Sequence, residues 1–115
     1  MYVDIQRLVL RYTQTNISCH WGVSPDNKVV TWYRDTATEG VQFLYMVTYT
    51  NSKVKDSYAS TAFKERIFGN DDHLINYHNI RIDNVTEQDN GHYWCEMSVT
   101  GYDFTAPAKS MEVIG

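Results

Sequence analysis

The residues that could form covalent or metal bonds are two cysteines and four histidines. Cys19 and Cys95 lie 76 positions apart and could be free thiols, metal ligands or a disulfide. A structural zinc site needs four ligands, and the histidines offer no i, i+4 pair of the helical zinc motif; they are His20, His73, His78 and His92. A disulfide that closes so long a loop would stabilise the fold by roughly 4 kcal/mol. We favour a disulfide over free thiols because the residues around the two cysteines agree with it, and we expect no bound metal.

The remaining polar residues do not form a recognisable catalytic set. The sequence contains no activated serine or cysteine and no carboxylate pair placed for acid–base catalysis. Its 10 Lys and Arg residues are scattered among 14 Asp and Glu residues, so it lacks the clustered cations that neutralise nucleic-acid phosphates. We therefore expect a protein that is not an enzyme, has no cofactor or small-molecule substrate, and does not bind nucleic acid.

The elements that must position these side chains are short β-strands. In residues 15–21 the side chains alternate between two faces, and Cys19 lies on the more apolar one. The same period places Tyr93 and Cys95 inward and turns Trp94 outward. Further strands are expected at residues 3–10, 29–34, 41–47, 79–85 and 108–113, with loops at 22–28 and 98–104 and a loop or edge strand at 48–53. About nine strands, with no helical period and no repeat, predict an all-β sandwich in one domain of residues 1–115.

No stretch of the chain is typical of a membrane span or a targeting segment. No apolar run approaches the length of about 20 residues that a transmembrane helix needs. No secretory signal peptide is visible, and we interpret Met1 as the start of a mature segment. Two Asn-x-Ser/Thr sequons begin at Asn16 and Asn84. They indicate an oxidising secretory route, and we expect both asparagines to be glycosylation sites.

One set of residues resembles a known family. Cys19, Trp32, Arg66 and the segment Asp89–Cys95, which has the sequence Asp-x-Gly-x-Tyr-x-Cys, resemble the variable-set (V-set) immunoglobulin domain across nearly the whole chain. The resemblance implies a two-sheet V-type sandwich with one inter-sheet disulfide between Cys19 and Cys95. It also implies that Trp32 packs against this disulfide.

The same resemblance assigns roles to the residues before Cys95. Gly91 would permit a tight turn, including a left-handed one. Tyr93 would return its hydroxyl to the backbone of the corner. Asp89 is expected to find a buried cation, and we assign it to Arg66 because a guanidinium pairs with a carboxylate through two hydrogen bonds.

An outward aromatic face is the feature that points beyond the framework. Trp94 is expected on the outer face of the sheet through which V-set domains pair. An exposed aromatic patch is costly to leave in water, so we expect a dimer interface there. Its expected members are Tyr33, Phe43, Tyr45, Trp94, Glu96 and Phe104. The alternative is that Trp94 is covered by the loop that follows it in its own chain.

Three loops are expected to form a ligand-binding tip at one end of the sandwich. Their hydroxyl, amide and glycine residues suit adaptable hydrogen bonding around aromatic anchors. The expected tip residues are Ser24, Asp26, Asn27, Lys28, Thr48, Tyr49, Thr50, Asn51, Val99, Thr100, Gly101 and Tyr102. The alternative is that they are ordinary solvated loops.

The finer resemblances suggest two functions. Residues 106–109 replace the Phe-Gly-x-Gly bulge of antibody and T-cell receptor domains, which indicates an invariant cell-surface receptor. Residues 32–34 and 41–48 resemble the alpha chain of the cytotoxic T-cell co-receptor, which implies a homodimer that binds the class I MHC heavy chain. Residues 63–67 are equally similar to myelin protein zero, and residues 30–35 to the programmed-death and natural-killer receptors. These imply an adhesion, inhibitory or activating domain that binds another immunoglobulin-like protein. Either function implies an extracellular domain at the plasma membrane, attached by a single span.

Overall fold

The computed structural model describes residues 1–71 and 76–115 and contains eleven β-strands within them. The strands are β1 (Tyr2–Ile5), β2 (Leu8–Leu10), β3 (Thr15–His20), β4 (Lys28–Thr36), β5 (Gly40–Thr50), β6 (Lys53–Ala59), β7 (Ile67–Asn70), β8 (Tyr77–Ile82), β9 (Gly91–Val99), β10 (Tyr102–Thr105) and β11 (Lys109–Ile114). One short 3₁₀ helix, η1 (Glu87–Asp89), precedes β9. No helix in this part of the chain is long and apolar enough to cross a membrane.

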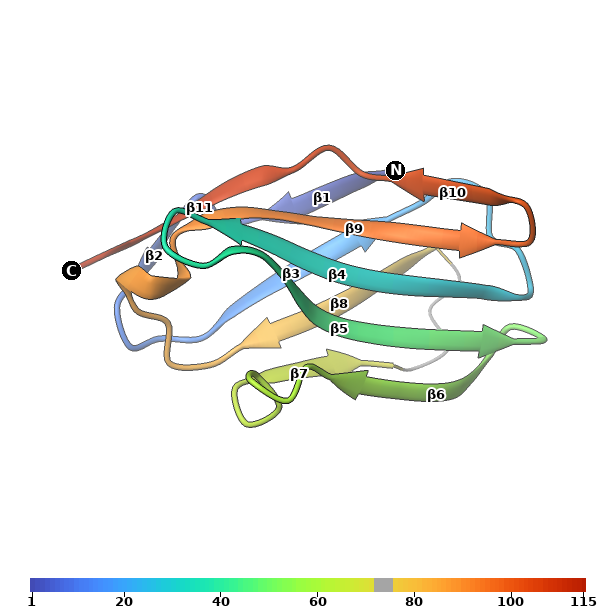
Figure 1. Cartoon of the computed structure of the whole chain (residues 1–115), viewed down its shortest axis with the longest axis horizontal. Helices are drawn as coiled ribbons and strands as arrows, with labels where there is room; N and C mark the ends of the chain where they lie inside the picture. Colours follow the sequence, from blue (N-terminus) through green and yellow to red (C-terminus); the bar gives the residue numbers. More distant parts are fainter. Residues whose placement is uncertain (72–75) are drawn as a thin grey trace.

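The strands form two sheets that lie face to face (Figure 1). The smaller sheet has the order β1-β3-β8-β7. The larger sheet has the order β2-β11-β9-β4-β5-β6, and β10 also pairs with β9. The expected all-β, two-sheet V-type sandwich is therefore confirmed.

The count of eleven strands differs from the expected nine because the first strand is divided and an expected loop contains a strand. The expected first strand becomes β1, which pairs with β3, and β2, which pairs in parallel with β11 in the other sheet. The expected last strand is β11, whereas β10 lies mostly in the expected loop at 98–104, and the two pair with different parts of β9. Pro107 lies in the break between them and has no N–H to donate to a ladder.

The core is built from the inward residues of both sheets. Cys19 on β3 and Cys95 on β9 form the expected disulfide across the two sheets, with their Cα atoms 6.2 Å apart. Trp32 lies directly opposite Cys95 in the β4–β9 register and is fully buried. Ile80 and Ile82 on β8 alternate with more exposed neighbours and are fully buried in the same core.

Gly91, at the corner before β9, is required for a different reason from the one expected. The backbone at Gly91 is not left-handed, since its φ angle is not positive. Instead, a Cβ atom at this position would collide with the carbonyl oxygen of Asp35 on β4. The glycine therefore permits a close approach of two strands rather than a left-handed turn. Tyr93 donates its hydroxyl to the carbonyl oxygen of Asp89 at 2.6 Å, as expected for the corner.

Candidate functional site

Four aromatic rings form a continuous row across the outer face of the larger sheet. Trp94 stacks on Tyr33 with ring centroids 5.8 Å apart. Tyr33 meets Phe43 edge-on at 6.4 Å, and Phe43 meets Tyr58 edge-on at 5.7 Å. These four residues, from β9, β4, β5 and β6 respectively, are called the aromatic band below. Adjacent strands thus supply one ring each to a single surface.

The sheet register explains why these rings share one face. Tyr33 lies directly opposite both Trp94 and Phe43, and Tyr58 lies opposite Met46. Directly opposed side chains in antiparallel strands point to the same side of the sheet. Trp94, Tyr33 and Phe43 are half-buried, and Tyr58 is 48% exposed. Tyr58 was not expected on this face, because it lies in a polar stretch of the sequence and its pairing as a strand is apparent only in the fold.

The expected place of Tyr45 in this face is wrong. The β4–β5 register shifts between Trp32 and Tyr33, which lie opposite Tyr45 and Phe43 respectively. Leu44 is the extra residue of this bulge. Tyr45 therefore faces the core, is only 6% exposed, and packs beside Gly69, where any Cβ would collide with its ring.

The expected place of Phe104 in this face is also wrong. Phe104 lies on β10 opposite Met97, a buried residue of the inner face, whereas Glu96 and Thr105 share the outer face. Phe104 is still 47% exposed, although it faces away from the side that carries Trp94. Residues 98–104 were expected to be a loop. Because residues 102–105 instead pair as strand β10, the Phe104 side chain points to the opposite side of the sheet from Trp94.

Carboxylates flank the aromatic band along the strands. Asp35 on β4 and Glu96 on β9 lie two residues beyond Tyr33 and Trp94, in the same alternation. Asp56 on β6 lies opposite Thr48, and Asp103 on β10 lies opposite Ser98. Burial, followed by the negative charge of Glu96, raises the pKa of Tyr33, which keeps its hydroxyl neutral. The outer face thus combines apolar rings with negative charge.

The loops at one end of the sandwich are braced against each other. The side chain of Asn27 accepts a hydrogen bond from the backbone N–H of Asn51 at 2.9 Å. Asp26 accepts one from the Ser52 hydroxyl at 2.7 Å. A hollow of about 540 Å³ lies beside these loops, lined by residues that include Asn27, Thr48, Thr50, Ser98, Val99 and Thr100. The structure therefore brings parts of all three expected tip loops together.

Several expected loop residues are strand residues instead. Thr48, Tyr49 and Thr50 belong to β5, while Val99 ends β9 and Tyr102 begins β10. The actual turns are short, at residues 51–52 and 100–101. Gly101 has a φ angle of 82°, a conformation that glycine adopts without strain. The tip therefore consists of strand ends and tight hairpins more than of long loops.

The expected exposure of Lys28 and Tyr49 to a ligand is wrong. Lys28 is only 4% exposed, and its ammonium donates to the carbonyl oxygen of Pro25 at 2.9 Å and to Ser24 Oγ at 3.3 Å. The ammonium also lies 4.6 Å from the centroid of the Tyr49 ring, and Tyr49 is buried. Burial lowers the pKa of Lys28. Its charge stabilises the tip from within and is not presented outward.

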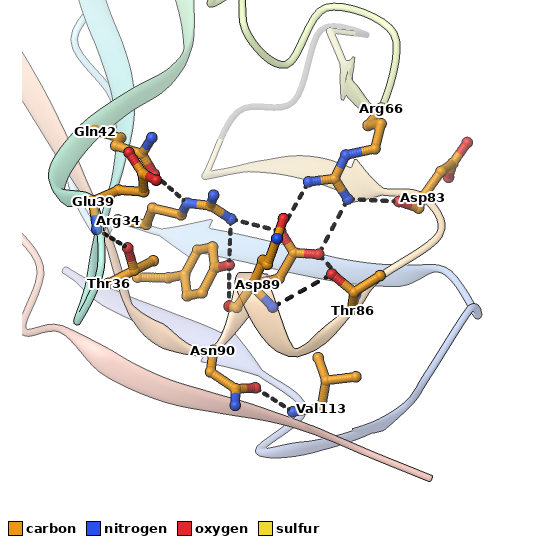
Figure 2. Close-up of polar contacts among 12 residues, drawn as sticks. Arg34, Thr36, Glu39, Gln42, Arg66, Asp83, Thr86, Asp89, Asn90 and Val113 are labelled. Atoms are coloured by element: carbon orange, nitrogen blue, oxygen red, sulfur yellow. Dashed lines mark hydrogen bonds and ion pairs between the residues drawn. The ribbon is translucent and has the colours of Figure 1, made fainter.

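The expected pairing of Asp89 with Arg66 is confirmed, and a second guanidinium joins it (Figure 2). Arg66 donates to both Asp89 oxygens, at 2.8 Å and 3.1 Å. Arg34 donates to Asp89 at 2.7 Å and to the Tyr93 hydroxyl at 3.2 Å. Burial alone would raise the pKa of Asp89, but hydrogen bonds, first from Arg66, hold it below its usual value. Arg34 could have been found from the sequence, since it follows the inward Trp32 by two residues.

A second buried polar cluster involves His78, which the sequence left without a partner. Its Nδ1 accepts a hydrogen bond from the indole N–H of Trp32 at 3.0 Å. Its Nε2 lies 2.8 Å from Asp71, which also accepts from the Tyr45 hydroxyl at 2.6 Å. Burial, followed by this hydrogen bond, raises the pKa of Tyr45 to about 12. The cluster stabilises the core and is closed to solvent at His78.

The other histidines have separate surroundings. His20 stacks between Tyr2 and Tyr77 on the outer face of the smaller sheet, and His92 is exposed on β9. His73 lies outside the described residues. Within residues 1–71 and 76–115, no group of His, Cys, Asp and Glu side chains could hold a metal ion.

The two sequons lie away from the aromatic band. Asn16 is exposed on β3, on the outer face of the smaller sheet. Asn84 is exposed in the turn after β8, with a φ angle of 52°. Their glycosylation remains a prediction.

The chain was compared with models of protein families and with curated proteins. A model of the immunoglobulin V-set domain matches residues 7–112. A comparison with curated proteins finds no matching relative.

Proposed function

The chain belongs to the immunoglobulin V-set domain family, and from this membership we propose that it binds another immunoglobulin-like surface protein through its aromatic band. V-set domains are typically binding domains rather than enzymes, and they are typically extracellular or on the cell surface. We propose the same setting for this chain, as a V-set domain in a receptor or adhesion ectodomain attached to the plasma membrane.

The aromatic band is the observation that carries this proposal. Aromatic side chains bury much apolar area at low cost in conformational entropy, and they dominate the energetics of protein interfaces. Here Trp94, Tyr33, Phe43 and Tyr58 keep one another ordered through their ring contacts and still retain exposed surface. Such a row is already arranged for binding, so a partner need not order it. Glycans at Asn16 and Asn84 would leave it uncovered.

A second candidate is favoured by the hollow at the tip. In this reading the chain is a homodimeric immune co-receptor, and its tip grips a protruding loop of the class I MHC heavy chain. The hollow of about 540 Å³ and its hydroxyl-bearing lining, which includes Thr48, Thr50 and Thr100, support it. The burial of Lys28 leaves the tip with less positive charge than the sequence suggested, so we place this candidate second.

One binding experiment separates the two candidates. The fluorescent tetrameric domain would be applied to cells that each display one immunoglobulin-like ectodomain or a class I MHC complex. Trp94→Ala should weaken binding to the responding ectodomain by about 30-fold, as expected for a hot-spot residue. Tyr77→Ala, a stacked tyrosine of the opposite sheet, should leave binding unchanged.

The tip is tested with Thr50→Arg, which fills the hollow from an exposed position. Binding that is lost with Thr50→Arg and kept with Trp94→Ala would refute the aromatic band as the site and support the class I MHC candidate. Each variant is first checked for an unchanged thermal unfolding midpoint.

A further inference from the structure

We propose that the partner of the aromatic band is a different protein, one that presents lysine or arginine side chains around an apolar centre, and not a second copy of this chain. This inference rests on the proposed function, because it specifies the chemistry of the partner at the same face.

The outer face that carries the aromatic band is negatively charged. The carboxylates that point outward from the same sheet as the band include four near it, and within the described residues none of these four takes part in an ion pair; they are Asp35, Asp56, Glu96 and Asp103. The register places Lys53 on this face, opposite Thr50 at the far end of β6, and leaves Lys55 at the β5–β6 irregularity without an opposite residue. Arg34, the nearest guanidinium in sequence, is buried on the inner side and bound to Asp89.

The carboxylates of this face lie on both sides of the aromatic band. Glu96 and Asp56 lie on the tip side of the band, two residues from Trp94 and Tyr58 respectively. Asp35 lies on the opposite side of the band, two residues from Tyr33. The rings are therefore flanked by negative charge in both directions along the strands. A partner that covers the rings must also cover or approach these carboxylates.

Symmetry then disfavours a second copy. In a two-fold dimer the same patch is used twice, so a face-to-face pair would bring one acidic rim against the other. The carboxylates on β4 and β9 would lose water without gaining a cation, since Arg34 is buried on the inner side and Lys53 lies at the far end of β6. A partner with a basic rim meets the same rings and pairs with the carboxylates, and its approach is accelerated by opposite charge.

Sedimentation velocity with an engineered second copy tests this inference. The probe is the chain with Asp35→Lys and Glu96→Lys, which keeps the aromatic band and reverses its rim. We expect the wild-type chain alone to stay monomeric at 100 μM in about 150 mM NaCl, and a mixture with the probe to form a heterodimer. The heterodimer should bind at least about tenfold more tightly than either chain binds itself, and this advantage should shrink in about 1 M NaCl.

The matched control carries the same change of charge elsewhere. Asp4→Lys with Glu65→Lys reverses two exposed carboxylates that lie away from the band. Its mixture with wild type should show no such heterodimer. Asp56→Lys with Asp103→Lys serves as a second probe in case the first unfolds, which thermal unfolding reports.

The outcomes separate this inference from the proposed function. Wild-type dimers that vanish with Trp94→Ala would overturn the inference and leave the aromatic band as an interface. An equal response to probe and control would overturn the inference. Association that depends on the reversed rim yet survives Trp94→Ala in both components would count against the aromatic band itself.

Discussion

Two polar clusters are buried between the sheets, and they are stabilised by different interactions. Around Asp89, two guanidiniums pair with a carboxylate whose pKa is held below its usual value, and Thr86 adds a backbone N–H at 3.0 Å. Around His78, only Asp71 is a carboxylate, and the indole and phenol are neutral donors. Because an indole N–H can only donate, His78 Nδ1 accepts and Nε2 carries the proton that is donated to Asp71. The first cluster depends on paired charges, whereas the second depends on a directed chain of hydrogen bonds.

This difference predicts the largest effect at Asp89. Asp89→Asn would leave the buried guanidinium of Arg34 without its anion, and we expect a loss of about 3–5 kcal/mol in the free energy of unfolding. Urea unfolding monitored by tryptophan fluorescence measures it. Asp83→Asn is the control, because the Arg81–Asp83 pair is partly exposed, with 43% and 35% of the side chains accessible, and should contribute less than about 1 kcal/mol. Equal losses in the two variants would contradict the charged character assigned to this cluster.

An intermediate effect is expected at His78. His78→Phe keeps a ring of similar shape but removes both hydrogen bonds, which leaves the Trp32 indole N–H buried without an acceptor. We expect a loss of about 1–3 kcal/mol, measured by the same urea method. His20→Phe is the control, since His20 is stacked on the outer face of the smaller sheet and its ring can be replaced there. If His78→Phe proves as mild as His20→Phe, the hydrogen-bond chain contributes little.

The smallest effect is expected in the pH dependence of Asp71→Asn. Burial by itself raises the pKa of Asp71, but hydrogen bonds from His78, Ser57 and Tyr45 hold it below the usual 3.8. A lowered folded-state pKa gives stability that is fully present above 3.8 and is lost as the pH falls from 3.8 through the lower folded-state pKa. Asp71→Asn should therefore be less stable than wild type by about 1 kcal/mol at neutral pH.

The difference between Asp71→Asn and wild type should shrink as the pH falls below 3.8, which urea midpoints across the acid range would report. If the difference in stability between wild type and Asp71→Asn stays constant from neutral to acid pH, the charge of Asp71 does not contribute to stability.

The sequence was informative about the framework because the relevant signals are local. The two-residue alternation around Cys19 and Cys95 predicts which side chains meet in the core, and the corner motif identifies Asp89 and Tyr93. Arg34 was within reach of the same reasoning, because it alternates with Trp32. The His78 cluster was not, since Asp71 and Tyr45 reach it only through the packing of β7 and β5 against β8.

On the outer face of the larger sheet, the two-residue alternation of the sequence failed to predict the direction of two side chains. A single bulge in the β4–β5 register turns Tyr45 inward, and the pairing of β10 with β9 turns Phe104 away from Trp94. One extra residue reverses every side chain that follows it, so a face cannot be assigned across an unseen bulge. Tyr58 joined the face only because β6 pairs with β5.

The sequence by itself determined the sandwich, because periodicity along one strand specifies what faces inward, and its resemblance to the V-set domain predicted the Cys19–Cys95 disulfide and the pairing of Asp89 with Arg66. Only the tertiary structure decided which aromatic rings form one row, that Lys28 is buried, and that carboxylates flank the row. Those properties depend on the register between strands distant in sequence, and register is set by the packing of the whole sandwich rather than by any one segment.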